Sequence, residues 1–148
     1  MDKQRVKYQT GFQRMISDLF TDSGNSKIQP AENILRRVLE RIDATPACVR
    51  TDTSGCITEI NPAFSQLCGY RFEEVKGRKP GSILQGEATT SESIEAIRQA
   101  IFERRACTVE MVNYHKDQTT YRVAIHVRPV FDETGAHEGF EALETKLS

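Results

Sequence analysis

The segment from Ile57 to Gly86 constrains the fold of this chain most, because it joins one short strand to several very short helices. A run rich in β-branched residues ends at Asn61-Pro62, and the apolar helical turn that follows is stopped by Gly69. Another short helix begins in the run FEEVKGR. Helices of one or two turns are unstable alone in water. We therefore expect this segment to pack against a sheet made by the rest of the chain.

Alternating apolar residues predict strands on both sides of this segment. Residues 47–52 and 56–61 are expected to form a hairpin whose turn contains Gly55. Residues 93–105 predict a helix, with an N-cap supplied by the preceding run TTSES. Three more strands are expected at 106–115, 120–130 and 138–146. The predicted fold class is α+β, with an antiparallel sheet of about five strands and helices on one face.

Two amphipathic helices are predicted ahead of this domain. Apolar residues recur at helical spacing in 3–20 and again in 31–43, and the polar stretch 21–30 between them reads as a linker. The expected division is therefore an N-terminal helical region, 1–43, and a folded domain, 44–148. The helices either cover the outer face of the sheet or join two copies of the chain, and both roles are compatible in a homodimer.

The composition limits the classes of partner. The 148 residues carry a formal net charge of −1, so we expect no nucleic-acid partner. No apolar run is long enough to span a membrane and no signal peptide is visible, so we expect a cytoplasmic protein without a membrane partner. The four cysteines, Cys48, Cys56, Cys68 and Cys107, have no paired metal-ligand spacing, so no metal site is predicted.

Several runs together resemble a known family. EINPAF, GY and EEVKGR resemble the core of PAS sensory domains. GRKPGSILQG, IRQAI and VNYHKD resemble the flavin-binding light-oxygen-voltage (LOV) branch of that family. The resemblance covers roughly residues 44 to 146. It implies a PAS fold and a role in sensing and signal transduction, through a homodimer and with an output kinase or another signalling protein.

Two polar residues fall on the predicted inner face of the sheet, among apolar neighbours. Asn113 and Glu144 would each cost free energy there unless something satisfies them. Backbone bonds, buried water or strand ends open to solvent would do so, and so would a ligand. In LOV domains the matching residues bond the flavin ring, and residues matching Gln85 and Arg98 lie near its phosphate. An exposed helical arginine such as Arg98 also needs no special explanation.

The sequence departs from the LOV pattern at four places. Gly81 stands where that branch has its reactive cysteine, with Pro80 as the alternative alignment, so residue type excludes the usual covalent adduct. Ser82 replaces a phosphate-binding arginine, Val123 a ring-contacting asparagine and Glu144 a glutamine. Cys68 is the alternative thiol, although a small buried core cysteine is the ordinary interpretation of this residue.

The cofactor is therefore left undetermined between two hypotheses. The first is a non-covalently bound flavin, FMN or FAD, used for redox or light sensing. The second is a ligand-free PAS module for protein interaction and dimerisation.

Two further classes are disfavoured. The predicted helix 93–105 contains no histidine that could bind haem iron. A small α+β enzyme could use Glu144 or Asp52 as a base, but no nucleophile and base occur in a recognisable set. We therefore predict that the chain is not an enzyme.

Overall fold

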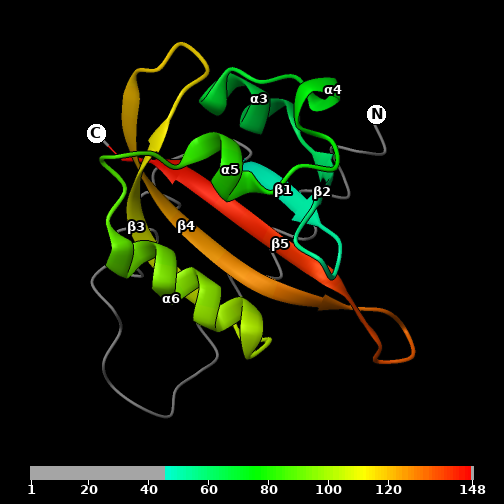
Figure 1. Ribbon diagram of the computed structural model, residues 1–148. Helices are drawn as coiled ribbons and strands as arrows, with labels where there is room; N and C mark the ends of the chain where they lie inside the picture. The colour runs from blue at the N-terminus through cyan, green and yellow to red at the C-terminus, as the bar shows by residue number, and fades with distance from the viewer. Residues whose placement is uncertain (1–45, 148) are drawn as a thin grey trace.

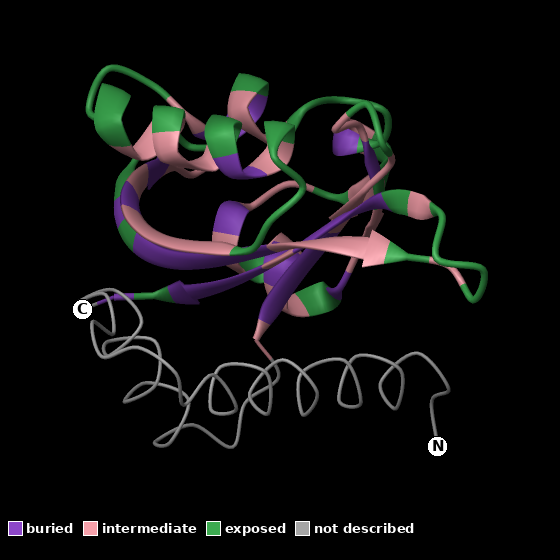
Figure 2. Ribbon diagram, turned by 90° about the horizontal axis from the view of Figure 1, so that it is seen from below, coloured by how far each residue is buried: buried purple, intermediate pink, exposed green. Residues whose placement is uncertain are grey.

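The computed structural model describes residues 46–147, which form one antiparallel sheet with helices on one of its faces (Figures 1 and 2). The strands are β1 (Ala47–Thr51), β2 (Ile57–Ile60), β3 (Cys107–Tyr114), β4 (Thr120–Phe131) and β5 (His137–Lys146), in the spatial order β2-β1-β5-β4-β3. The helices are α3 (Pro62–Cys68), α4 (Phe72–Val75), α5 (Pro80–Leu84) and α6 (Ser91–Phe102). The predicted α+β fold with five strands is confirmed. The predicted helices 3–20 and 31–43 and the linker 21–30 lie outside the described residues.

Asn61 connects the first hairpin to the short helices. Its backbone is extended, and its Oδ1 accepts hydrogen bonds from the N–H groups of Cys48 and Phe64, each at 2.9 Å. Its Nδ2 donates to the carbonyl of Pro46 at 2.8 Å. One buried side chain therefore caps α3 and fixes that helix to the start of β1. Pro62, which follows, suits the first turn of a helix because it lacks an N–H.

Gly69 ends α3 and allows a second close contact. Its φ of 80° lies in the left-handed region that favours glycine at a helix C-terminus. A Cβ at this position would overlap the imidazole of His115. The backbone of Lys116 donates to the carbonyl of Cys68 at 2.9 Å. The β3–β4 turn is therefore held against the end of α3.

The apolar interior consists of two clusters. One lies under α3, α4 and α5 against β1 and β2, and includes Val49, Phe64 and Leu84. The other lies on β3, β4 and β5, and Ile97 and Ile101 of α6 pack against it. Among the described residues, two partly buried ones pack against both clusters, namely Leu67 and Ala142. Neither group of helices covers the whole sheet. The space between the two clusters therefore has one group of helices on each side.

Two hydroxyl groups anchor α6 along the edge of the sheet. Thr89 Oγ1 donates to the carbonyl of Val112 at 2.7 Å, and Ser93 Oγ donates to the carbonyl of Glu110 at 3.0 Å. Thr90 caps the helix with its own side chain. These bonds use carbonyls on β3 that would otherwise face outward. They also fix the direction in which the side chains of α6 extend toward the sheet.

The outer face of the sheet carries a buried ion pair that the sequence did not predict. Glu141 is 2% exposed, and its carboxylate accepts from Arg50 Nε at 2.7 Å and Arg128 Nη2 at 2.9 Å. These residues come from β5, β1 and β4, which are neighbours in the sheet. Leu143 and Ala124 lie on this face by strand alternation and are also buried. No helix within residues 46–147 has the length and apolar character needed to cross a membrane.

We predict that Asn61→Ala destabilises the protein by about 3 kcal/mol, because it removes a cap and leaves the buried backbone N–H of Cys48 without its side-chain acceptor. Thr90→Ala is the matched control, since Thr90 caps α6 with one longer bond of 3.3 Å to Ser93 and is exposed. We expect that control to cost about 1 kcal/mol or less. Urea unfolding of both variants measures the difference. Equal losses would show that Asn61 acts only as a helix cap.

Candidate ligand cavity between the sheet and the helices

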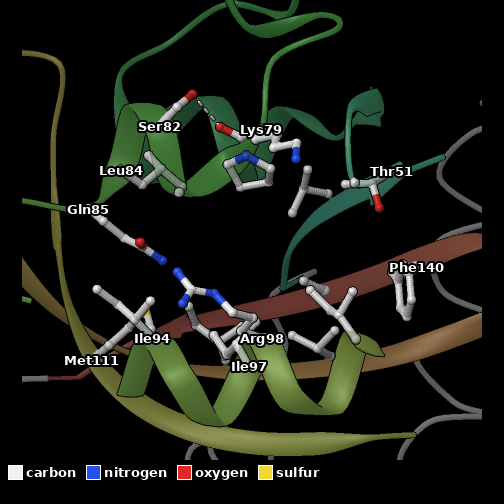
Figure 3. A pocket seen from close by; sticks show the side chains of 18 of the residues that line it. Thr51, Lys79, Ser82, Leu84, Gln85, Ile94, Ile97, Arg98, Met111 and Phe140 are labelled. Atoms are coloured by element: carbon white, nitrogen blue, oxygen red, sulfur yellow. Dashed lines mark hydrogen bonds between the residues drawn. The ribbon is translucent and has the colours of Figure 1, made fainter. Parts of the chain in front are cut away.

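A cavity of about 390 Å³ lies between the inner face of the sheet and helices α5 and α6 (Figure 3). This volume falls within the range of small-molecule sites. Its wall is mainly apolar and includes residues of both interior clusters: Val49, Leu84, Ile94, Ile97, Ile101, Met111, Ile125, Val127, Phe140 and Ala142. The described residues contain no group of three or more side chains suited to hold a metal ion. The volume and the apolar wall suit an organic ligand.

Asn113 and Glu144 supply the buried polar groups of the wall. Both line the cavity, and their exposed fractions are 1% and 4%. Asn113 Oδ1 and Glu144 Oε2 have no hydrogen-bond partner among the described residues. An unsatisfied buried acceptor costs about 1 to 3 kcal/mol. A ligand with hydrogen-bonding groups along one edge would remove this cost.

The carboxyl of Glu144 has a pKa above its ordinary value. Burial raises the pKa of its carboxyl to about 7, and it forms no ion pair with a described residue. Near neutral pH the group is therefore divided between a carboxylate, which only accepts hydrogen bonds, and a carboxylic acid, which can also donate one. Glu144 can therefore accept a hydrogen bond from a donor of a ligand or, when protonated, donate one to an acceptor.

Tyr121 lies beside this polar end, and the sequence analysis did not single it out. It stands directly opposite Asn113 in the β3–β4 register, and its hydroxyl is buried beside the Asn113 side chain. Burial, and then the charge of Glu144, raises the pKa of this hydroxyl far above its ordinary value. The strand register was the signal that could have found it, because it pairs the two residues across adjacent strands.

Gln85 and Arg98 lie at the rim of the cavity, as the resemblance implied for residues near a ligand's tail. Gln85 follows α5 and Arg98 lies on α6, and Figure 3 shows their side chains pointing toward each other. Arg98 is exposed and also contacts Glu95 at 3.3 Å. The rim includes Lys79 as well, a residue that the sequence analysis did not select. Its signal was the basic run before Pro80 in GRKPGS.

Gly81 and Ser82 also line the cavity, on α5. A Cβ at Gly81 would lie 3.0 Å from Gln85 Oε1, so the amide of Gln85 packs where a larger side chain would stand. Ser82 Oγ donates to the carbonyl of Lys79 at 2.7 Å. Val123, in contrast, is fully buried in the interior and is not among the described lining residues. The structure thus brings six of the seven candidate residues to one cavity.

No cysteine of the described part of the chain lines the cavity. Cys68 is fully buried at the end of α3, and burial raises the pKa of its thiol to about 11. A thiol with such a pKa is almost entirely protonated at neutral pH and is a poor nucleophile. Its placement agrees with the ordinary interpretation of Cys68 as a core residue.

We predict that Glu144→Gln is more stable than the wild type at about pH 8, by up to about 3 kcal/mol, because each pH unit between the two pKa values costs about 1.4 kcal/mol. The folded-state pKa is raised, so the stability from Glu144 is complete below its unfolded pKa and is lost as pH rises through about 7. Glutamine stays neutral and avoids this loss. Urea unfolding between about pH 5 and pH 8 measures it.

The exposed Glu138 offers the control, since Glu138→Gln removes a charge from the same strand without relieving a buried group. Its pH profile should follow the wild type. Parallel profiles for Glu144→Gln and the wild type would contradict a raised pKa at Glu144.

Comparison with known proteins places this fold and cavity in context. Over 84 residues the chain is 36% identical to Blue-light-activated histidine kinase 1 of Erythrobacter litoralis (strain HTCC2594), covering 57% of this chain and 23% of that protein. It is 37% identical over 86 residues to Protein TWIN LOV 1 of Arabidopsis thaliana, covering 57% of this chain and 21% of that protein. The matched part is thus less than a quarter of the length of these two relatives.

The fold also has solved counterparts. The light-state structure of the blue-light photoreceptor Aureochrome1 LOV aligns with a TM-score of 0.66 and 28% identity, covering 70% of this chain and 82% of that one. The family model described as "PAS domain" matches residues 44–143, well over half of the 148 residues. The resemblance to the LOV branch seen in the sequence therefore has support from both sequence and structure. The chain belongs to the PAS domain family.

Proposed function

We propose that this chain is a sensory signal-transduction module that binds a flavin, FMN or FAD, without a covalent bond. The observation that carries the proposal is the pair of unsatisfied buried acceptors, Asn113 Oδ1 and Glu144 Oε2, at the wall of an apolar cavity of about 390 Å³. A flavin ring is flat and mainly apolar, with hydrogen-bonding groups along one edge. Those properties match the wall and its polar end.

The residues of the cavity divide the work of binding. Asn113 and Glu144 would bond the polar edge of the ring, and the apolar residues of β4, β5 and α6 would enclose its faces. Gln85 and Arg98 would contact the tail at the rim. A bound flavin supplies visible-light absorption and reversible electron uptake. With its pKa near 7, Glu144 can hold or release a proton beside the ligand.

The proposed binding is non-covalent because the described cavity has no thiol. Gly81 has no side chain to react, and Cys68 is buried away from the lining with a raised pKa. Any response to light or to redox conditions would therefore act through hydrogen bonds and protonation. The names of the relatives refer to blue light, and this supports light as one candidate signal.

The proposed partners are an output kinase and a second copy of this chain. A relative named as a histidine kinase supports an output kinase as the receiver of the signal. We propose a homodimer as the working form, and the cytoplasm as its location. That the chain is not an enzyme stays a prediction.

The second candidate function is a ligand-free PAS module that acts by protein interaction and dimerisation. Val123 favours it, because this fully buried apolar residue stands where the LOV branch has a ring-contacting asparagine. One lost bond is worth about 1 kcal/mol, or several-fold in affinity. The two candidates differ in whether the purified protein takes up flavin.

We predict that the full chain takes up FMN or FAD and shows structured flavin absorption bands. Asn113→Ala should weaken uptake by about fivefold to tenfold, since it removes a polar contact in a buried site. Absorption spectra before and after blue illumination with a reductant present would show bands that bleach reversibly. A colourless protein that takes up no added flavin would instead support the ligand-free module.

The homodimer prediction can fail separately. Light scattering should give the mass of two chains for the full protein and of one chain when residues 1–43 are deleted. If the shortened protein still has the mass of two shortened chains, the contact between the copies lies on the sheet itself. A monomeric full chain would refute the dimer.

A further inference from the structure

The polar end of the cavity has a third side chain beside Asn113 and Glu144. Tyr121 contributes a hydroxyl whose oxygen is buried, as are Asn113 Oδ1 and Glu144 Oε2. The three residues come from β4, β3 and β5, which lie next to one another in the sheet. Tyr121 is not among the described lining residues. Any effect of its hydroxyl on a ligand therefore passes through a neighbouring side chain.

The strand order leaves Asn113 with one directly opposite neighbour. In the described sheet β3 is an edge strand that pairs with β4, and Tyr121 stands opposite Asn113 in that pairing. Side chains opposite each other on one face of an antiparallel pair are close enough to interact. The hydroxyl has no hydrogen bond of normal geometry among the described residues, so it and the amide face each other in a loose contact. A small turn of the amide would convert this contact into a hydrogen bond.

The direction of this contact follows from its effect on the tyrosine. Burial, and then the charge of Glu144, raises the pKa of the Tyr121 hydroxyl, and the Asn113 side chain acts in the opposite direction. A hydrogen bond lowers the pKa of a phenol when it is donated to the phenol oxygen, so Asn113 directs Nδ2 toward it. The other titratable groups that act on this hydroxyl are Cys68 and Tyr70, and neither is a cation. The phenol therefore keeps its proton near neutral pH, and its oxygen can accept from Nδ2.

We infer that Tyr121 is a positioning residue of the ligand site, which accepts a hydrogen bond from Asn113 Nδ2 and thereby presents Asn113 Oδ1 to the ligand. A terminal amide can turn and exchange its donor and its acceptor, so an asparagine without such a neighbour would suit a ligand acceptor as well as a ligand donor. With Tyr121 in place, the site selects a polar edge that carries an N–H group. The inference rests on the proposed function and deepens it, because the polar edge of a flavin has an N–H between two carbonyl groups.

The test is a double-mutant cycle of the full chain with two ligands, FMN and FMN methylated at that ring nitrogen. Quenching of flavin fluorescence gives the affinities. Tyr121→Phe should weaken FMN by about threefold to tenfold, as expected when one buried hydrogen bond is lost. It should leave the methylated flavin within about twofold, because that ligand has no N–H to offer to Oδ1. Added to Asn113→Ala, it should change the affinity for FMN by less than about twofold, since its effect passes through Asn113.

Tyr114→Phe is the matched control. It removes the same hydroxyl group from the neighbouring position on β3, but Tyr114 does not line the cavity and its hydroxyl accepts from the backbone N–H of Ala88 at 2.9 Å. Its preference between the two flavins should follow the wild type. A variant that merely loosens the fold would weaken both flavins alike, so the ratio of the two affinities reports positioning and not stability.

The outcomes separate the inference from the proposed function. A preference for FMN over the methylated flavin that falls in Tyr121→Phe and is kept in Tyr114→Phe supports the inference. Equal losses of both flavins in Tyr121→Phe, or additive effects of Tyr121→Phe and Asn113→Ala, overturn the positioning role while the flavin proposal stands. Where the methyl group itself prevents binding, the cycle with Asn113→Ala decides alone. Failure of the wild type to bind FMN overturns both.

Discussion

The cavity depends on a mismatch between the width of the sheet and the length of the helices that cover it. Helices α3, α4 and α5 have only seven, four and five residues, and their apolar side chains form one cluster with β1 and β2, while α5 also contacts β3. The longer α6 packs over β3 and β4. Two apolar clusters result, with space between them. A ligand bound in this space would add dispersion contacts with both clusters and would also stabilise the fold.

Asn61 and Gly69 fix this arrangement because short helices cannot hold their own positions. Asn61 bonds α3 to the start of β1, and Gly69 brings the end of α3 against the β3–β4 turn. The other wall is fixed by the hydroxyls of Thr89 and Ser93, at the start of α6, which donate to carbonyls of β3. The cavity walls are thus set by a few polar contacts at helix ends, and the apolar surfaces between them are free to face a ligand.

Much of this was predictable from the sequence, and the remainder required the register. Alternation with a period of two placed Asn113 and Glu144 on the inner face, and the glycine and asparagine signals marked the ends of α3. Tyr121 was missed because its proximity to Asn113 depends on the pairing of two strands. Lys79 was missed because a lysine in a polar run gives no sign of facing a cavity. Val123 shared the inner face, but the pattern could not show that it is packed inside rather than lining.

Two buried glutamates on β5 differ in their hydrogen-bond partners. Glu141 and Glu144 are three residues apart, point to opposite faces and are both almost fully buried. On the outer face Glu141 is bonded by two arginines from neighbouring strands. On the inner face Glu144 has an oxygen with no described partner and a pKa raised to about 7. Because buried charges are normally paired, a group bound in the cavity, as proposed above, would supply a partner that the described residues do not give Glu144.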